Sequence, residues 1–157
     1  METQSKNISS PTVLVVDDNE TVLDLLDLLL SNHGSTVLRA QSGSQCLAIV
    51  QREPVDLVIL DVMMPGMDGI KVTAELKRTM PSLPIILLTA KDDLATRAAA
   101  MELGVNEFVT KPIHNRELLS RVRTQISTRR WEMDIERTTA SVARLSEAYA
   151  GKVESKA

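Results

Sequence analysis

Aromatic residues are almost absent from this chain, which has one Phe, one Trp and one Tyr among its 157 residues. A hydrophobic core must therefore be built from Leu, Val, Ile, Ala and Met. Cysteine is equally rare: the single Cys46 excludes an intramolecular disulfide and fits a reducing compartment. Because Cys46 lies within an apolar segment, we expect it to be a small core residue. The two isolated histidines do not form the kind of cluster that binds zinc.

Long apolar segments are lacking as well. No segment approaches the length needed to span a bilayer, and the polar N-terminus lacks the apolar core of a signal peptide. We therefore expect a cytoplasmic protein without a membrane partner. The formal net charge of −3 argues against a surface that binds nucleic acid directly.

Short apolar segments alternate with segments of helical periodicity along most of the chain. The expected strands are 12–16, 36–40, 55–60, 85–88 and 105–110, and the expected helices are 20–31, 42–52, one after Gly69, 92–103 and one from about Asn115. Short, fully apolar strands are typical of parallel sheets buried on both faces. The alternation predicts an α/β, doubly wound, five-stranded parallel sheet with helices on both faces, flavodoxin-like with strand order 2-1-3-4-5, and an extended C-terminal helix.

Polar side chains stand where four of the expected strands end. Asp17 and Asp18 follow the first strand, Asp61 follows the third, Thr89 the fourth and Lys111 the fifth. In an open sheet of this order, ligands bind beyond the carboxyl ends of the strands, between strands one and three. The acidic residues therefore lie where the fold predicts a binding site.

Three carboxylates in one crevice repel each other and need a cation to remain ionised together. Their hard oxygen ligands suit Mg²⁺ or Mn²⁺. A divalent ion beside a carboxylate, a hydroxyl and an ammonium group is suited to phosphoryl transfer.

In these segments the chain closely resembles the receiver domain of bacterial two-component response regulators. The matching motifs are Asp17-Asp18, Asp61 within Asp-Val-Met-Met-Pro-Gly-Met-Asp-Gly, Thr89-Ala90, and Phe108-Val109-Thr110-Lys111-Pro112. The resemblance covers about residues 12–127. Each motif alone is weak, but four in the right order at the right strand ends are specific.

The resemblance implies a role for each residue of the acidic group. Asp61 would accept a phosphoryl group from a histidine kinase or a phosphotransfer protein. Asp18, Asp61 and the backbone carbonyl of Met63 would bind Mg²⁺ (or Mn²⁺) directly, and Asp17 would act mainly through a coordinated water. Met63 and Lys91, in loops beside the site, are also predicted to tune the lifetime of the phosphoryl group.

The resemblance also implies a switch. Lys111 would pair with Asp61 and later with the phosphoryl group, and the Lys111–Pro112 peptide bond would be cis. Thr89 would move towards the phosphoryl oxygen and Phe108 would turn inward, which changes the surface of the fourth helix, fifth strand and fifth helix. Such a module would assist only its own phosphorylation and dephosphorylation, and would not be an enzyme.

Several alternatives remain open on the sequence alone. Acidic residues after a strand often cap the next helix, as Asp18 or Asn19 would, and Phe108 could simply pack in the core. The chain could be a receiver fragment of a larger regulator whose output domain is absent, or a phosphorylation-independent adaptor. A phosphatase would normally need a second Asp close after its nucleophile, whereas Val62 and Met63 follow Asp61.

The segment after the expected receiver continues without Gly or Pro to Ala150. Its apolar positions follow the alternating spacing of four and three that is typical of a coiled coil: Trp131, Ile135, Thr138, Val142, Leu145 and Tyr149. This pattern predicts a helical extension through which two copies could form a homodimer, or else a helix that folds back or frays. We therefore divide the chain into a flexible leader (1–11), a receiver domain (12–127), a helical extension (128–150) and a disordered tail (151–157).

Overall fold

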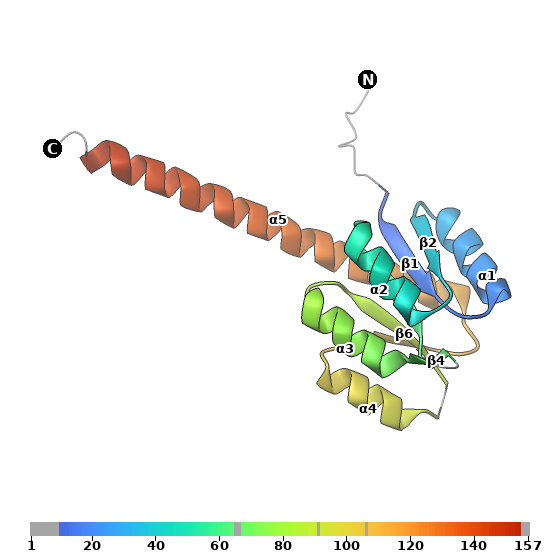
Figure 1. Ribbon diagram of the computed structural model, residues 1–157. Coiled ribbons are helices and arrows are strands. Elements are labelled where there is room, and N and C mark those ends of the chain that lie inside the picture. The colour runs from blue at the N-terminus through green and yellow to red at the C-terminus, as the bar shows by residue number, and fades with distance from the viewer. Residues whose placement is uncertain (1–9, 65–66, 91, 106, 155–157) are drawn as a thin grey trace, which may run out of the picture.

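The structure is a computed structural model that describes residues 10–64, 67–90, 92–105 and 107–154. Its central sheet has five parallel strands in the order β2-β1-β3-β6-β7 (Figure 1). Their bounds are β1 Thr12–Val16, β2 Thr36–Ala40, β3 Leu57–Asp61, β6 Ile85–Thr89 and β7 Glu107–Thr110. In chain order these strands are arranged 2-1-3-4-5, so the predicted doubly wound, flavodoxin-like topology is confirmed. All residues of β3 and β6 are buried, which explains why both strands are apolar up to their last residues, Asp61 and Thr89.

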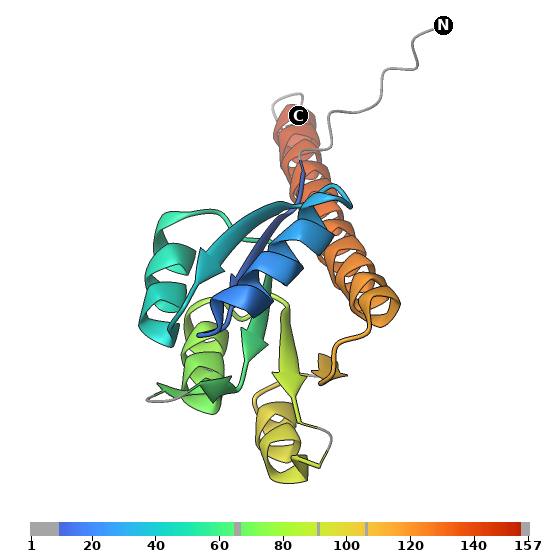
Figure 2. The same cartoon turned by 90° about the vertical axis from the view of Figure 1, so that its right-hand side faces the viewer.

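Helices cover both faces of the sheet (Figure 2). Their bounds are α1 Glu20–Ser31, α2 Gly43–Arg52, α3 Gly69–Thr79, α4 Leu94–Glu102 and α5 Asn115–Glu154. Apolar residues of α1 and the first part of α5 pack on one face, and those of α2, α3 and α4 pack on the other. Cys46 on α2 is buried in the second of these cores, and burial raises the pKa of its thiol to about 12. Cys46 is therefore a core residue, as expected.

Side-chain caps determine where several helices begin. Asn19 accepts hydrogen bonds from the backbone N–H groups of Thr21 and Val22, so Asn19 rather than Asp18 caps α1. Asp93 caps α4 by accepting a hydrogen bond from the backbone N–H of Thr96. This cap explains why α4 begins at Leu94 instead of the expected residue 92.

A short antiparallel pair that was not predicted follows β3. Its strands are β4 (Met63–Met64) and β5 (Met67–Asp68). The next residue, Gly69, begins α3 so close to the preceding loop that a Cβ atom there would lie 2.7 Å from Cα of Val62. Glycine is therefore required at this position by the close approach of the two backbone segments.

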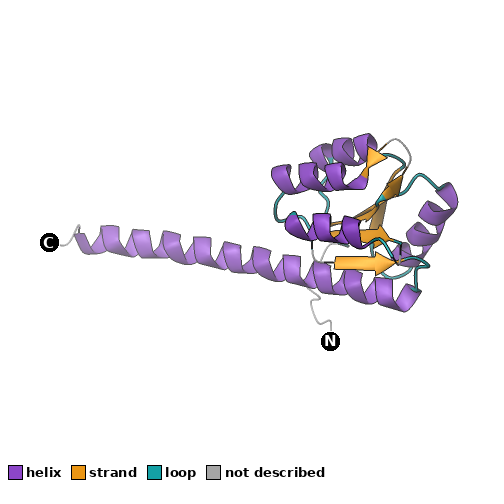
Figure 3. Ribbon diagram, turned by 90° about the horizontal axis from the view of Figure 1, so that it is seen from below, coloured by secondary structure: helices purple, strands orange, loops and turns teal. Residues whose placement is uncertain are grey.

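The C-terminal helix α5 is one unbroken helix of 40 residues, which corresponds to a length of about 60 Å. Leu118, Val122 and Ile126 pack on the sheet, whereas every residue from Trp131 to Gly151 is exposed. Figures 1 and 3 show this second part extending away from the sheet, so the helix does not fold back on its own domain. It ends at Glu154, beyond residue 150 where the extension was expected to end.

Parts of the predicted leader and tail, residues 1–9 and 155–157, lie outside the described residues, as does Lys91. Within the described ranges, no helix combines the length and the apolar character needed to cross a membrane.

Candidate functional site

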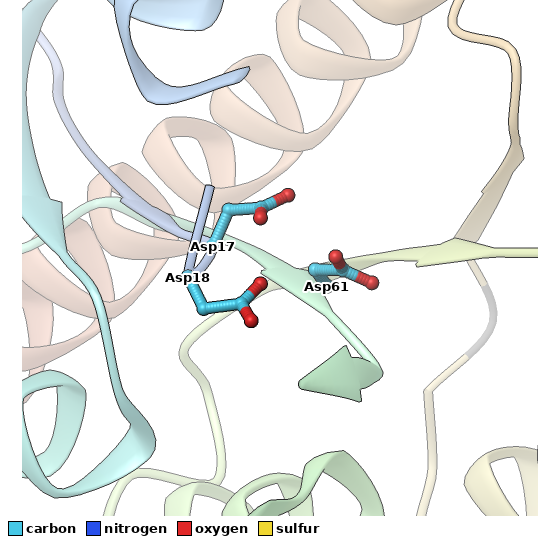
Figure 4. A group of neighbouring side chains, drawn as sticks. All are labelled: Asp17, Asp18 and Asp61. Carbon is cyan, nitrogen blue, oxygen red and sulfur yellow. The ribbon is translucent and has the colours of Figure 1, made fainter. Parts of the chain in front are cut away.

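The acidic residues meet at the carboxyl ends of two adjacent strands. Asp17 directly follows β1 and its backbone N–H bonds to the carbonyl oxygen of Ala40 on β2. Asp61 is the last residue of β3, which lies next to β1 in the sheet. Carboxylate oxygens of Asp17, Asp18 and Asp61 all lie within 4.8 Å of one another (Figure 4). The fold therefore brings together the three carboxylates that the sequence placed at these strand ends.

Asp17 has an unfavourable environment for a carboxylate. It is 1% exposed, and Oδ1 accepts a hydrogen bond of 2.9 Å from the backbone N–H of Asn19. Its Oδ2 is buried and accepts no hydrogen bond from the described residues. Burial raises the pKa of Asp17 to about 6, and the charge of Asp61 adds to the effect, while the hydrogen bond from Asn19 opposes it. A bound cation would give this buried oxygen a partner and would reduce the repulsion between the three carboxylates.

Both oxygens of Asp61 are engaged, although the residue is only 2% exposed. Lys111 Nζ donates to Oδ2 at 2.7 Å, and the backbone N–H of Met63 donates to Oδ1 at 2.9 Å. The same Nζ lies 3.9 Å from Oδ2 of Asp17. The Lys111–Pro112 peptide bond is cis. Lys111 therefore reaches the acidic group from the end of β7, with its charge directed at Asp61.

Thr89 and Phe108 lie on β6 and β7, the last two strands of the sheet. Thr89 is fully buried at the end of β6, where it pairs in register with Thr110 of β7. Phe108 is half-buried and packs against the core beneath α2, α3 and α4. Thr89 therefore ends the strand next to the one that carries Asp61, and Phe108 lies one strand further along the sheet.

Arg97 on α4 was not among the residues expected at the site. Its Nε and Nη2 atoms donate to Thr89 Oγ1 at 3.3 and 3.2 Å, and Nη2 donates to Thr110 Oγ1 at 2.6 Å. Its guanidinium carbon lies 5.9 Å from the centroid of the Phe108 ring. The available sequence signal was weak: Arg97 is the single cation of an Ala-rich helix.

The donor set fits a hard divalent cation. Three carboxylates supply oxygen ligands, which suit Mg²⁺ or Mn²⁺ better than a metal that prefers nitrogen or sulfur. Asp18 is exposed, so the group is open to solvent on that side. Met63 lies in β4 beside Asp61, and a role for its carbonyl oxygen as a ligand stays a prediction.

Residues 13–123, which contain every residue of this site, match the family model of the response regulator receiver domain. The chain belongs to this family. A receiver domain is a signalling module of two-component systems, and its family implies histidine kinases or phosphotransfer proteins as partners. The exposed part of α5 lies beyond the matched residues.

Solved receiver structures resemble most of the chain. The signal receiver domain of an HD domain-containing protein from Pseudomonas fluorescens Pf-5 is 31% identical with a TM-score of 0.77, and the match covers 85% of this chain and 98% of that one. A putative response regulator from Chloroflexus aurantiacus J-10-fl is 35% identical with a TM-score of 0.71, covering 75% and 98%. A CheY-like receiver domain protein from Methanospirillum hungatei JF-1 shares the fold at 24% identity, with a TM-score of 0.76 over 79% of this chain and 99% of that one.

Proposed function

We propose that the protein is a phosphorylation-controlled receiver in which Asp61 accepts a phosphoryl group from a histidine kinase or a phosphotransfer protein. The observation that carries the proposal is the environment of the Asp61 carboxylate. One oxygen is bound by Lys111 at 2.7 Å, the other by the backbone N–H of Met63 at 2.9 Å, and the unsatisfied Oδ2 of Asp17 belongs to the same cluster. This arrangement orients a buried nucleophile beside a cation-binding group.

The transfer would need little more than positioning and charge neutralisation. An oxygen of Asp61 forms a bond to phosphorus while the bond between phosphorus and the donor imidazole nitrogen breaks, and the nitrogen keeps the electron pair. Lys111 then pairs with a phosphoryl oxygen, and the hydroxyl of Thr89 donates a hydrogen bond to another. A Mg²⁺ or Mn²⁺ ion held by Asp17, Asp18, Asp61 and the carbonyl of Met63 would neutralise the phosphoryl oxygens.

An apolar groove next to Lys111 supports docking of a protein phosphodonor. The groove has a volume of about 550 Å³ and lies between α1 and the loop that follows β7, with Pro112 and Ile113 in its wall. Leu25 and Leu28 on α1 line it and are 63% and 62% exposed. Exposed leucines beside a reactive centre suit the apolar face of a partner helix that carries the phosphorylated histidine.

The exposed part of α5 supports homodimerisation. Its apolar stripe, defined as Trp131, Ile135, Thr138, Val142, Leu145 and Tyr149, has the spacing of a coiled coil, and all six residues are exposed. The positions beside it are small and neutral from residue 139 onward (Thr139, Ser141, Ser146 and Ala148), so two copies would meet along this part without repulsion between charges. Helices in proteins gain most of their stability by packing an apolar face against a partner, and a second copy is the partner we propose.

We do not expect the protein to act as an enzyme. Val62 and Met63 follow Asp61, so the sequence lacks the second Asp that a phosphatase normally carries close after its nucleophile as a general acid. A phosphorylation-independent adaptor and a fragment of a larger regulator remain alternatives for the output. The cytoplasmic location expected from the sequence stays a prediction.

Mass spectrometry after incubation with acetyl phosphate and Mg²⁺ tests the assignment of Asp61. The wild-type protein should gain one phosphoryl group, and Asp61→Asn should gain none because the amide is not a nucleophile. Asp56→Asn is the control, since Asp56 lies at the other end of β3 and bonds to the backbone N–H of Thr12. A mass increase that persists in Asp61→Asn would contradict the proposal.

A further inference from the structure

Arg97 connects α4 to the ends of two strands through the hydroxyl groups of two threonines. Its guanidinium donates two hydrogen bonds to Thr89 Oγ1 and one to Thr110 Oγ1, and it lies over the Phe108 ring at 5.9 Å. We call these contacts the Arg97 bridge. The bridge thus contacts both residues, Thr89 and Phe108, that the proposed phosphorylation switch would move.

We propose that the Arg97 bridge holds the receiver in its resting conformation, and that Arg97 thereby sets how tightly the site binds a phosphoryl group. This inference rests on the proposed function, because it assumes that Thr89 turns towards Asp61 when a phosphoryl group is present. It adds a residue on α4 to those that control the site, and Arg97 acts as a positioning residue through Thr89.

The bonding capacity of Thr89 explains why the bridge opposes the switch. A hydroxyl oxygen has two acceptor lone pairs, and Arg97 directs two N–H groups at the Oγ1 of this fully buried residue. Threonine is stiff about χ1, so turning Oγ1 towards Asp61 requires a discrete rotamer change rather than a gradual shift. That change would break both hydrogen bonds from Arg97.

The other two contacts make the bridge cooperative. The 2.6 Å hydrogen bond to Thr110 fixes the guanidinium on β7, so Arg97 cannot simply follow Thr89. The guanidinium also lies over Phe108, and a cation on an aromatic face stabilises the ring in its present position. A movement of Thr89 and a movement of Phe108 would each break contacts with the same guanidinium group. The two movements therefore share an energetic barrier.

The experiment compares binding of beryllofluoride with Mg²⁺, a phosphoryl analogue, by calorimetry on the full chain. We expect Arg97→Met to tighten binding by roughly three- to tenfold, since the resting state loses hydrogen bonds that the bound state does not have. Thr110→Val should tighten binding in the same direction, because it removes the anchor of the guanidinium while leaving Arg97 and Thr89 in place. Thr110→Ser, which keeps the hydroxyl, is the matched control and should bind like the wild type.

A spectroscopic measurement separates positioning from a general loss of stability. Without beryllofluoride, the NMR signal of the Thr89 methyl group in Arg97→Met should shift from its wild-type position towards that of the beryllofluoride-bound wild type. Unchanged or weaker binding in both Arg97→Met and Thr110→Val would overturn the inference while leaving the proposed function intact. If the wild type fails to bind beryllofluoride, or if Asp61→Asn binds it equally well, both proposals are wrong.

Discussion

Among single residues, Asp17 has the clearest conflict between stability and function. Its carboxylate is buried, one of its oxygens receives no hydrogen bond within the described structure, and the neighbouring Asp61 carries the same charge. Burying a charge in this way destabilises a fold unless a partner compensates for it. A residue kept in so unfavourable a position is best explained by a ligand that the site binds, which here would be the divalent cation.

We therefore expect Asp17→Asn to stabilise the metal-free protein at pH 7.5. The pKa of Asp17 is raised from 3.8 to about 6 in the folded protein, so its folded form binds a proton more readily than its unfolded form. The contribution of Asp17 to stability consequently falls as the pH rises from about 4 to about 6 and stays low above that range. Since one pKa unit corresponds to about 1.4 kcal/mol, a rise from 3.8 to about 6 corresponds to a gain on the order of 3 kcal/mol.

Differential scanning calorimetry without divalent ions measures this effect. The melting temperature of Asp17→Asn should exceed that of the wild type at pH 7.5, and the difference should shrink towards pH 4. Addition of Mg²⁺ should stabilise the wild type more than the variant. A lower melting temperature for Asp17→Asn at pH 7.5 without metal would contradict the assignment of an unfavourable charge.

At the scale of secondary-structure elements, α1 carries two sets of leucines on two sides. Leu23, Leu26 and Leu30 are buried in the core, whereas Leu25 and Leu28 remain exposed in the groove beside Lys111. The first set stabilises the fold, and the second set has no evident structural role within the domain. The exposed pair can therefore be changed without damaging the core.

Leu28→Glu should slow phosphoryl transfer from a protein donor by roughly tenfold or more, because a buried hydrophobic contact at an interface is replaced by a charge that must be desolvated. The rate with acetyl phosphate should be unchanged, since this small donor needs no docking groove. Met101→Glu on α4 is the matched control, because Met101 and Leu28 are both 62% exposed. The measurement is radiolabel transfer from a histidine kinase domain that phosphorylates the wild type. If Leu28→Glu slowed transfer from the kinase domain and from acetyl phosphate equally, the docking role would be contradicted.

The elements also show what could be predicted from the sequence. β3 and β6 were evident as continuous apolar segments, and Asp61 could be assigned to the site because parallel strands end at one edge of the sheet. The position of Arg97 could not be predicted, since it depends on how α4 packs over the ends of β6 and β7. The pair β4–β5 was also missed, because two-residue strands carry no periodicity. Contacts set by tertiary packing, rather than by local pattern, account for these omissions.

For the whole molecule, the main question is what covers the exposed part of α5. The apolar stripe on this part, from Trp131 to Tyr149, contains Leu145 and Tyr149, which are 70% and 72% exposed. A monomer that exposes such a stripe on a projecting helix would leave it in contact with water along its whole length. We therefore expect the protein to associate in solution.

Light scattering on residues 1–157 should give the mass of a dimer, and a chain that ends at Ser127 should give that of a monomer. Leu145→Asp should also be monomeric at micromolar concentration, because it places a charge in the apolar stripe. Ala140→Asp, a change on the opposite side of the helix, should remain dimeric. A monomeric wild-type protein, with or without beryllofluoride and Mg²⁺, would exclude the dimer.

The unbroken course of α5 also determines the angular relation between its two parts. Val122 and Ile126 face the sheet, and Thr138 and Val142 in the stripe each follow one of them by sixteen residues. At about 100° per residue, sixteen residues amount to four full turns and a further 160° or so. The stripe therefore faces almost directly away from the sheet. Two copies joined along it would hold their receiver domains on opposite outer flanks, with both proposed phosphorylation sites free to meet a kinase independently.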